Sequence, residues 1–255
     1  MLHNRFCQFL MLYISGIMFL FGVKVLLGVS NYVIPSLYQI YETTCFISGQ
    51  YVIETINTMS IAMIGHMIAI CAAISISIIG RFKHGIGSFI TASAYQIQAY
   101  PIVAIAPIIF ILLGDGIISR LLIAALICYF PLLLTCMGIF TEPVKDVEHF
   151  YITTNQINWK LQIKIRAYEH FGKILTVIEG SATTAIVGTI VAEFISSDSG
   201  IGRCISIALS QNDLAKILIA LFLIGIATTF YLSILEFLGK KIRMACHITM
   251  TNDYH

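Results

Sequence analysis

The chain has 255 residues, of which 58% are hydrophobic and only 11% are charged, with a formal net charge of +2 at pH 7. Soluble domains carry about 25% charged residues, so this composition excludes an ordinary soluble protein. Four long segments contain no Asp, Glu, Lys or Arg: residues 55–80, 84–114, 121–141 and 217–235. Each is long enough to cross the hydrocarbon core of a bilayer as a helix, which takes about 20 residues.

In chain order, the pattern predicts membrane helices near residues 8–29, 58–80, 87–113, 118–140, 174–196 and 212–236. The apolar character of the first continues past Lys24, and no Ala-x-Ala site follows, which favours a retained span over a cleaved signal peptide. Polar residues in the third indicate that part of it lies at the membrane interface or inside the bundle. We therefore expect an all-α fold: a polytopic transmembrane bundle of about six spans, forming a single domain over residues 1–255.

The distribution of Lys and Arg predicts how this bundle is oriented, because cytoplasmic loops are enriched in both. With the N-terminus inside, eleven of these residues fall on the inner side and four on the outer side. This arrangement places both termini in the cytoplasm. It places residues 30–57, 114–116 and 196–200 on the outer side.

One charged, amphipathic segment, residues 142–173, interrupts the apolar chain on the predicted cytoplasmic side and holds nine of the 28 charged residues. Its first part has apolar residues at helical spacing and predicts a short amphipathic helix that ends near Asn155. From Ile157 to Arg166 the apolar residues alternate as in a strand, but a lone strand would leave its backbone groups unpaired, so we do not expect one. The segment is either a basic loop at lipid headgroups or a docking surface, and Trp159 in its middle favours docking.

Ionisable residues inside a membrane span are costly and often functional, and three of those within the predicted spans stand out. Glu193 lies near the outer end of the fifth span, where a hydrogen bond to the outer loop is favoured over contact with a substrate. Glu179, in the same span, faces either a translocation path or a basic cytoplasmic residue. His66, in the middle of the second span, is expected to be neutral and hydrogen-bonded to a neighbouring helix rather than a proton relay.

Small residues also recur along one face of the fifth span. Ser181, Thr184 and Gly188 share that face, and such a stripe indicates close helix packing or a polar pathway between two copies, with packing favoured. The seven cysteines are scattered without a C-x-x-C pair, so we expect no metal site.

Four short sequences, together with the order of features, resemble the membrane subunits of ABC importers of the nitrate/sulfonate/taurine type, the binding-protein-dependent transport inner membrane component family. Each is similar to a motif of that family, and together they extend the resemblance over most of the chain. They are V-I-P-S-L at 33–37, Y-P-I-V-A-I-A-P-I at 100–108, G-D-G-I-I-S-R at 114–120, and G-T-I-V-A-E-F at 188–194 followed by S-G-I-G at 199–202.

The resemblance implies that residues 142–173 are the cytoplasmic loop that couples such permeases to their ATPase. Aligned on Trp159, Asn155 takes the place of the family's glycine and His149 that of its glutamate, with Glu148 one position earlier. Tyr168 stands where the family has proline. Asn is the residue that most readily replaces glycine in a left-handed turn, so Asn155 is compatible with that position.

The function that the resemblance implies is that of a permease subunit of an ATP-driven importer in the bacterial inner membrane, taking up a small solute such as nitrate, a sulfonate, taurine or a vitamin precursor. The expected partners are an ABC ATPase, a second permease copy forming a homodimer, an extracytoplasmic substrate-binding protein and the lipid bilayer, but no nucleic acid. Residues proposed for the translocation pathway are Ser181, Thr184, Gly188 and Glu193.

Two other functions are weighed against this one. The chain has no G-x-x-x-x-G-K-[ST] loop, so ATP and magnesium are expected in the partner ATPase, with no cofactor and no catalysis in this chain. An ATP-independent secondary transporter or channel would usually carry interior charges and internal repeats, and here the charges are few and no repeat is evident. A membrane-embedded enzyme ranks last, because neither H-E-x-x-H nor paired intramembrane carboxylates occur.

Overall fold

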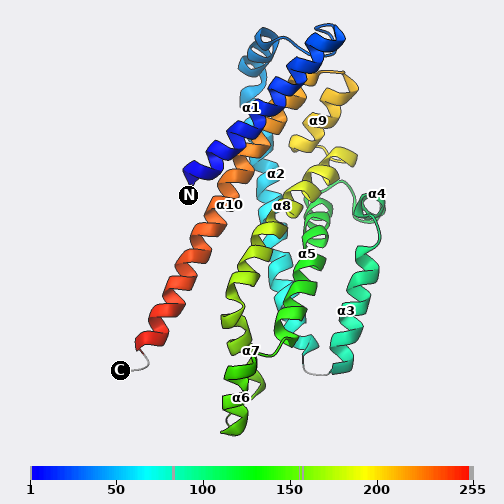
Figure 1. Cartoon of the computed structure of the whole chain (residues 1–255). Helices are drawn as coiled ribbons and strands as arrows, with labels where there is room; N and C mark the ends of the chain where they lie inside the picture. Colours follow the sequence, from blue (N-terminus) through cyan, green and yellow to red (C-terminus); the bar gives the residue numbers. More distant parts are fainter. Residues whose placement is uncertain (1, 82–83, 155, 157, 253–255) are drawn as a thin grey trace.

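The computed structural model describes residues 2–81, 84–154, 156 and 158–252, and every regular element among them is a helix. In Figure 1 the long helices run side by side, with α6 and α7 at one end of the bundle and α9 near the other. The described helices are α1 (Leu2–Leu27), α2 (Leu37–Gly80), α3 (His84–Gln98), α4 (Ile102–Leu113), α5 (Ile117–Thr141), α6 (Lys145–Thr153), α7 (Trp159–Glu169), α8 (Phe171–Ile195), α9 (Ile201–Ser210) and α10 (Leu214–Asn252).

Five of the described helices are long and apolar enough to cross a membrane: α1, α2, α5, α8 and α10. They confirm the predicted all-α membrane fold and correspond to five of the predicted spans. The third predicted span, residues 87–113, was wrong as a single helix. The chain forms α3 and α4 there, separated at Pro101, which has no backbone N–H to donate and disfavours helical geometry at Tyr100.

Helix α2 begins much earlier than predicted. Residues 37–57, expected in an outer loop, are helical and continuous with the predicted span. Ser36 starts the helix: its Oγ accepts a hydrogen bond from the backbone N–H of Gln39 at 3.3 Å, and its own N–H donates to Gln39 Oε1 at 2.8 Å. Such a reciprocal capping box satisfies two backbone donors at a helix N-terminus.

The core lies where α5 packs between α2 and α8 (Figure 1). Glycines let these helices approach closely. A methyl group on Gly65 would lie 2.9 Å from Cβ of Ala124, and one on Gly188 would overlap the side chain of Ile127. Without an aqueous driving force between helices, this close van der Waals packing is a main source of association inside a membrane.

A buried hydrogen-bonded group joins three helices halfway along the bundle. His66 of α2 is fully buried, with Nδ1 2.7 Å from the Tyr231 hydroxyl of α10 and Nε2 2.8 Å from Ser181 Oγ of α8. Because Ser181 Oγ donates to the carbonyl of Ile178, we assign the imidazole proton to Nε2 and the acceptor role to Nδ1. The predicted interhelical hydrogen bond of His66 is therefore present.

The charged segment contains two helices. The first, α6, is the predicted amphipathic helix. The second, α7, covers most of the alternating stretch and is not a strand, in agreement with the expectation. Asn158 caps α7, because its side-chain oxygen accepts a hydrogen bond from the backbone N–H of Leu161 at 2.8 Å.

Candidate functional site

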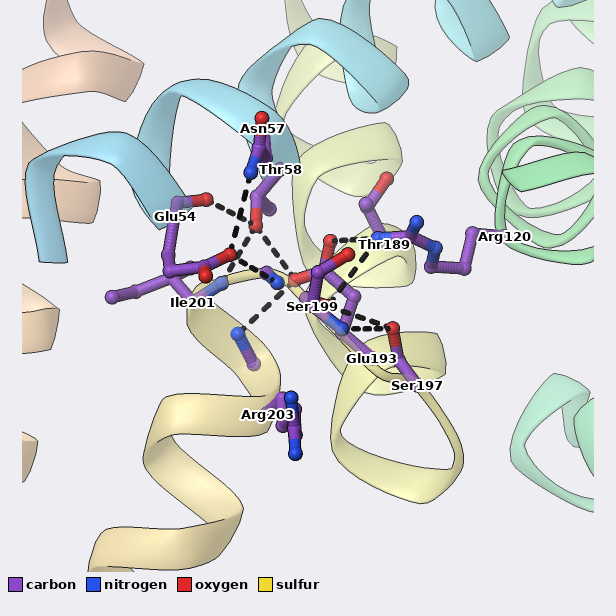
Figure 2. Close-up of polar contacts among 12 residues, drawn as sticks. Glu54, Asn57, Thr58, Arg120, Thr189, Glu193, Ser197, Ser199, Ile201 and Arg203 are labelled. Carbon is purple, nitrogen blue, oxygen red and sulfur yellow. Dashed lines mark hydrogen bonds and ion pairs between the residues drawn. The ribbon is translucent and has the colours of Figure 1, made fainter. Parts of the chain in front are cut away.

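Two polar clusters lie at opposite ends of the bundle, and the first surrounds the N-terminus of α9. The first backbone N–H groups of a helix have no partner inside the helix. Here Gly200 N–H donates to Glu54 Oε2 at 2.6 Å, Ile201 N–H to Thr58 Oγ1 at 2.9 Å, and Gly202 N–H to Glu193 Oε2 at 3.1 Å. Figure 2 shows these side chains converging from α2 and α8 on the start of α9. The helix is thus held by groups from two other helices.

Glu193 is the centre of this cluster, with its side chain fully buried. Its carboxylate accepts a hydrogen bond from the Thr58 hydroxyl at 2.6 Å and lies 3.4 Å from Nη1 of Arg120 on α5. Arg120, itself buried, also donates to the carbonyl of Ser199 at 3.3 Å. A buried carboxylate is tolerable only when paired and hydrogen-bonded, and this one is both.

Two glycines make room for the Glu193 carboxylate. Gly200 has a φ of +103°, and a Cβ there would overlap the carboxylate itself. A Cβ on Gly202 would overlap the backbone carbonyl of Ile190. The S-G-I-G sequence is therefore required by close approach of the backbone to Glu193.

The Glu193 contacts agree with the favoured prediction of a hydrogen bond to the outer loop. Sequence reasoning missed Glu54 and Thr58, which were assigned to an outer loop and the start of a span. Their spacing of four residues on one helix face was the available signal. Arg120 was noted only as part of a motif, although an arginine at the start of an apolar span is itself a sign of a buried partner.

The proposed pathway residues lie in α8 among side chains of the same chain. Ser181 and Gly188 are buried, in contact with His66 and Ile127 respectively, and the Thr184 hydroxyl donates to the carbonyl of Ser181 at 2.8 Å. The packing expected of this face is present. A role for it in solute passage stays a prediction.

A separate network of charges joins α1, α8 and α10. Arg5 Nη2 lies 3.1 Å from Glu179 Oε2, and Arg5 Nε lies 3.0 Å from Glu236 Oε2. Lys240 Nζ lies 2.9 Å from Glu236 Oε1. Glu179 therefore faces a basic residue, which was one of its two predicted alternatives.

The second polar cluster anchors the charged segment to the end of α5. Arg166 of α7 binds Glu148 of α6 through two nitrogens, Nε at 2.5 Å and Nη2 at 2.7 Å. Its Nη1 donates to the Phe140 carbonyl at 2.6 Å, and Arg81 Nη1 donates to the same carbonyl at 2.6 Å. Arg81 Nη2 also donates to Gln162 of α7 at 2.7 Å. Two guanidinium groups at a helix C-terminus complement its partial negative charge.

The ion pair of Glu148 and Arg166 is buried, with side chains only 6% and 5% exposed. Hydrogen bonds from Arg166 lower the pKa of the Glu148 carboxyl below its ordinary value, against the opposing effect of burial. Glu148 thus faces inward and holds α6 on α7. It was expected in the coupling loop, and the described contacts give it a positioning role there.

The same charged segment also carries exposed apolar side chains. His149 is also exposed, and Asn155 lies outside the described residues. The exposed fraction is 61% for Phe150 and 46% for Trp159. Val147 and Ile152 are exposed as well. Exposed aromatic and branched side chains on a segment anchored by Arg166 and Arg81 are suited to docking a protein partner.

The chain is similar in sequence to a family model and to several known proteins. Residues 75–244 match the family model described as binding-protein-dependent transport system inner membrane component. The chain is 32% identical over 132 residues to the riboflavin transport system permease protein RibX of Chloroflexus aurantiacus, covering 51% of this chain and 49% of that protein. It is 25% identical over 174 residues to a probable ABC transporter permease protein of Haemophilus influenzae, covering 68% and 69%.

A third relative is matched over a longer stretch. The chain is 20% identical over 196 residues to the formylaminopyrimidine transport permease protein ThiX of Halalkalibacterium halodurans, covering 76% of this chain and 78% of that protein. The chain therefore spans about half the length of the riboflavin permease and more than two thirds of the other two.

Proposed function

This chain belongs to the binding-protein-dependent transport system inner membrane component family, and from that premise we propose that it is the membrane permease subunit of an ATP-driven importer of a small solute. The observation that carries the proposal is the position of α6 and α7 inside the matched region, residues 75–244. There exposed apolar side chains are attached through Arg166 and Arg81 to the end of a membrane span.

These side chains, Val147, Phe150, Ile152 and Trp159, are the proposed contact with an ABC ATPase. Arg166 and Arg81 share the Phe140 carbonyl at the end of α5, so a displacement of α6 or α7 would be transmitted directly to a membrane helix. Because the sequence has no G-x-x-x-x-G-K-[ST] loop, the proposal assigns ATP binding and hydrolysis to the partner. In this role residues 142–173 are the coupling loop of a single permease domain.

The rest of the proposed assembly depends on which side of the membrane each part of the chain faces. Both termini, α6 and α7 lie in the cytoplasm of a bacterial cell, and α9 lies toward the outer side. A second copy of the chain completes the translocation pathway, and an extracytoplasmic binding protein delivers the solute. The excess of Lys and Arg on the predicted inner side supports this orientation.

Among small solutes, nitrogen heterocycles are the first to test. The relatives RibX and ThiX are named for riboflavin and formylaminopyrimidine transport, and both compounds are nitrogen heterocycles.

The test uses proteoliposomes that contain the chain and its cognate ABC ATPase, with the cognate binding protein added outside. We expect ATP-dependent accumulation of solute and co-purification of the ATPase with the chain. Uptake driven by a proton gradient in vesicles without any ATPase would contradict the proposal and favour a secondary transporter.

A further inference from the structure

A groove with a volume of about 680 Å³ lies between α3 and α5 and is closed at one end by the last residues of α2. Ligand pockets typically have volumes of about 300–1,000 Å³, so the groove is large enough for a small organic solute. Its walls are mostly apolar and carry a few hydroxyl groups. The lining includes Ser88, Thr91 and Tyr95 from α3, Gly138 and Thr141 from α5, and Arg81.

The break between α3 and α4 begins within one turn of Tyr95, the last α3 residue in the groove lining. Helix α3 rises about 22 Å over its 15 residues, less than the roughly 30 Å hydrocarbon core, so the break falls before the segment has crossed. Packing agrees with this depth, because Ala94 and Ala106, on either side of the break, each belong to a buried cluster that includes residues of α5.

The residues at the break are polar, aromatic and exposed. Tyr95 is 61% exposed and Tyr100 is 64% exposed, and Gln96 and Gln98 are exposed beside them. Irregular backbone at membrane depth is tolerated only where protein covers it or where it lines a water-filled cavity. Exposed glutamine amides in a membrane segment without charged residues likewise indicate that either protein or a water-filled cavity lies beside them. This face of α3 is therefore not a lipid-facing surface.

We propose that the groove between α3 and α5, with the exposed stretch from Tyr95 to Tyr100, is the solute-contacting surface of the permease, and that its solute is a flat heteroaromatic compound. This inference rests on the proposed function and deepens it. It also places the pathway on α3 rather than on the α8 face of Ser181 and Gly188, which is filled by contacts within the chain.

The chemistry of Tyr95 in the groove and of the adjoining exposed stretch up to Tyr100 favours this solute class. Tyrosine rings stack on flat rings, and a glutamine amide offers both a donor and an acceptor to the amide-like edge of a heterocycle. Among the described residues of the groove, Arg81 is the only one with a permanent charge. Its two terminal nitrogens are already bonded to Phe140 and Gln162. Among the described residues, neither terminal nitrogen of Arg81 is left for a nitrate or sulfonate, and its Nε is buried without a hydrogen-bond partner.

Cysteine labelling tests the surface without requiring transport. In a chain whose native cysteines are replaced by serine, Thr91→Cys, Gln98→Cys and the control Phe89→Cys are treated in membrane vesicles with a charged methanethiosulfonate. Phe89 is 73% exposed on α3 but lies outside the groove lining. We expect the first two thiols to react at least about tenfold faster, because only a hydrated thiol ionises. Equal rates at all three positions would overturn the proposal.

Protection from labelling tests the solute class with riboflavin, a 4-aminopyrimidine and nitrate as probes. We expect riboflavin or the aminopyrimidine, but not nitrate, to slow the labelling of Thr91→Cys. Protection by nitrate alone, or by none of the probes, would overturn the assignment of a heteroaromatic solute.

A steric variant provides an independent test in the reconstituted importer. A Cβ on Gly138 meets no atom within 4 Å, so Gly138→Leu should fold and partly fill the groove. We expect it to reduce uptake at least about tenfold while the ATPase still co-purifies, with Gly138→Ala as the milder control. Normal uptake by Gly138→Leu would contradict a pathway through the groove. Failure of the unsubstituted complex to show any ATP-dependent uptake would instead contradict the proposed function, and the labelling pattern would remain interpretable.

Discussion

Arg5 on the first helix and Glu236 on the last form an ion pair, with Nε and Oε2 3.0 Å apart although 231 positions separate them in the chain. Arg5 also binds Glu179, so one guanidinium connects α1 to both α8 and α10. The described contacts of α1 are otherwise mostly with α10. This arginine is therefore a principal attachment of the N-terminal helix to the bundle.

Replacing Arg5 should loosen that attachment. We expect Arg5→Met to lower the free energy of unfolding by about 1–2 kcal/mol, a value reduced for partial exposure of the pair, because two carboxylates lose their shared cation. Thermal unfolding in detergent measures the change. Arg5→Lys is the matched control and should lose less. A double variant, Arg5→Glu with Glu236→Arg, that is no more stable than Arg5→Glu alone would speak against direct pairing.

Removing the carboxylate of Glu193 should be more damaging. Glu193→Ala leaves Arg120 buried without its partner and frees the N–H of Gly202, so we expect a loss of about 3–5 kcal/mol. Glu193→Gln keeps an acceptor for Thr58 and should cost clearly less. Chemical denaturation of the solubilised protein compares the two. Equal stability of both variants and the unsubstituted chain would show that the cluster does not hold α9.

A methyl group at Gly200 should also disturb this cluster. Gly200→Ala places a Cβ at positive φ against the Glu193 carboxylate, and we expect a loss of about 1–3 kcal/mol. Gly116→Ala is the control, because a Cβ at Gly116 meets nothing within 4 Å and its φ of −85° suits alanine. Melting temperatures of the two variants provide the comparison, and a similar decrease in both would contradict the close approach.

The ion pair of Glu148 and Arg166 predicts a dependence of stability on pH. Because the pKa of Glu148 is lowered in the folded protein, its contribution is fully present above the ordinary glutamate pKa and is lost as the pH falls through the lowered value. We expect Glu148→Gln to be about 1.5–3 kcal/mol less stable than the unsubstituted chain at pH 7. This difference should shrink in acid, which thermal unfolding at a series of pH values would show. A difference that is constant from pH 7 to pH 3 would count against the pair.

Trp159 should contribute to ATPase binding. Its side chain is 46% exposed, and exposed tryptophans are frequent binding hot spots. Trp159→Ala should weaken the affinity of the reconstituted, folded chain for its ATPase about tenfold or more. Leu112→Ala, at a residue that is 75% exposed at the other end of the bundle, should leave the affinity unchanged. Titrating the ATPase over each immobilised variant measures the two affinities.

Several features of the fold could be predicted from residues close together in the chain. The charge-free segments predicted five of the membrane helices, and helical spacing predicted α6. The third segment was predicted as one helix because its composition is apolar throughout, whereas a single residue, Pro101, interrupts the backbone hydrogen bonds. The start of α2 was missed because residues 37–57 are mixed in polarity. The available sequence signal was Ser36 followed three residues later by Gln39, which is the pattern of a capping box.

The sequence by itself determined that this chain is a helical membrane protein with one charged, partly helical segment, because hydrophobicity and periodicity are local properties of a chain. Only the tertiary structure decided which polar residues meet. Glu193 with Thr58 and Arg120, Glu148 with Arg166, and Arg5 with two glutamates are pairings across 18 to 231 positions. A buried charge must find a partner, but its identity depends on how helices pack, and no local pattern encodes that packing.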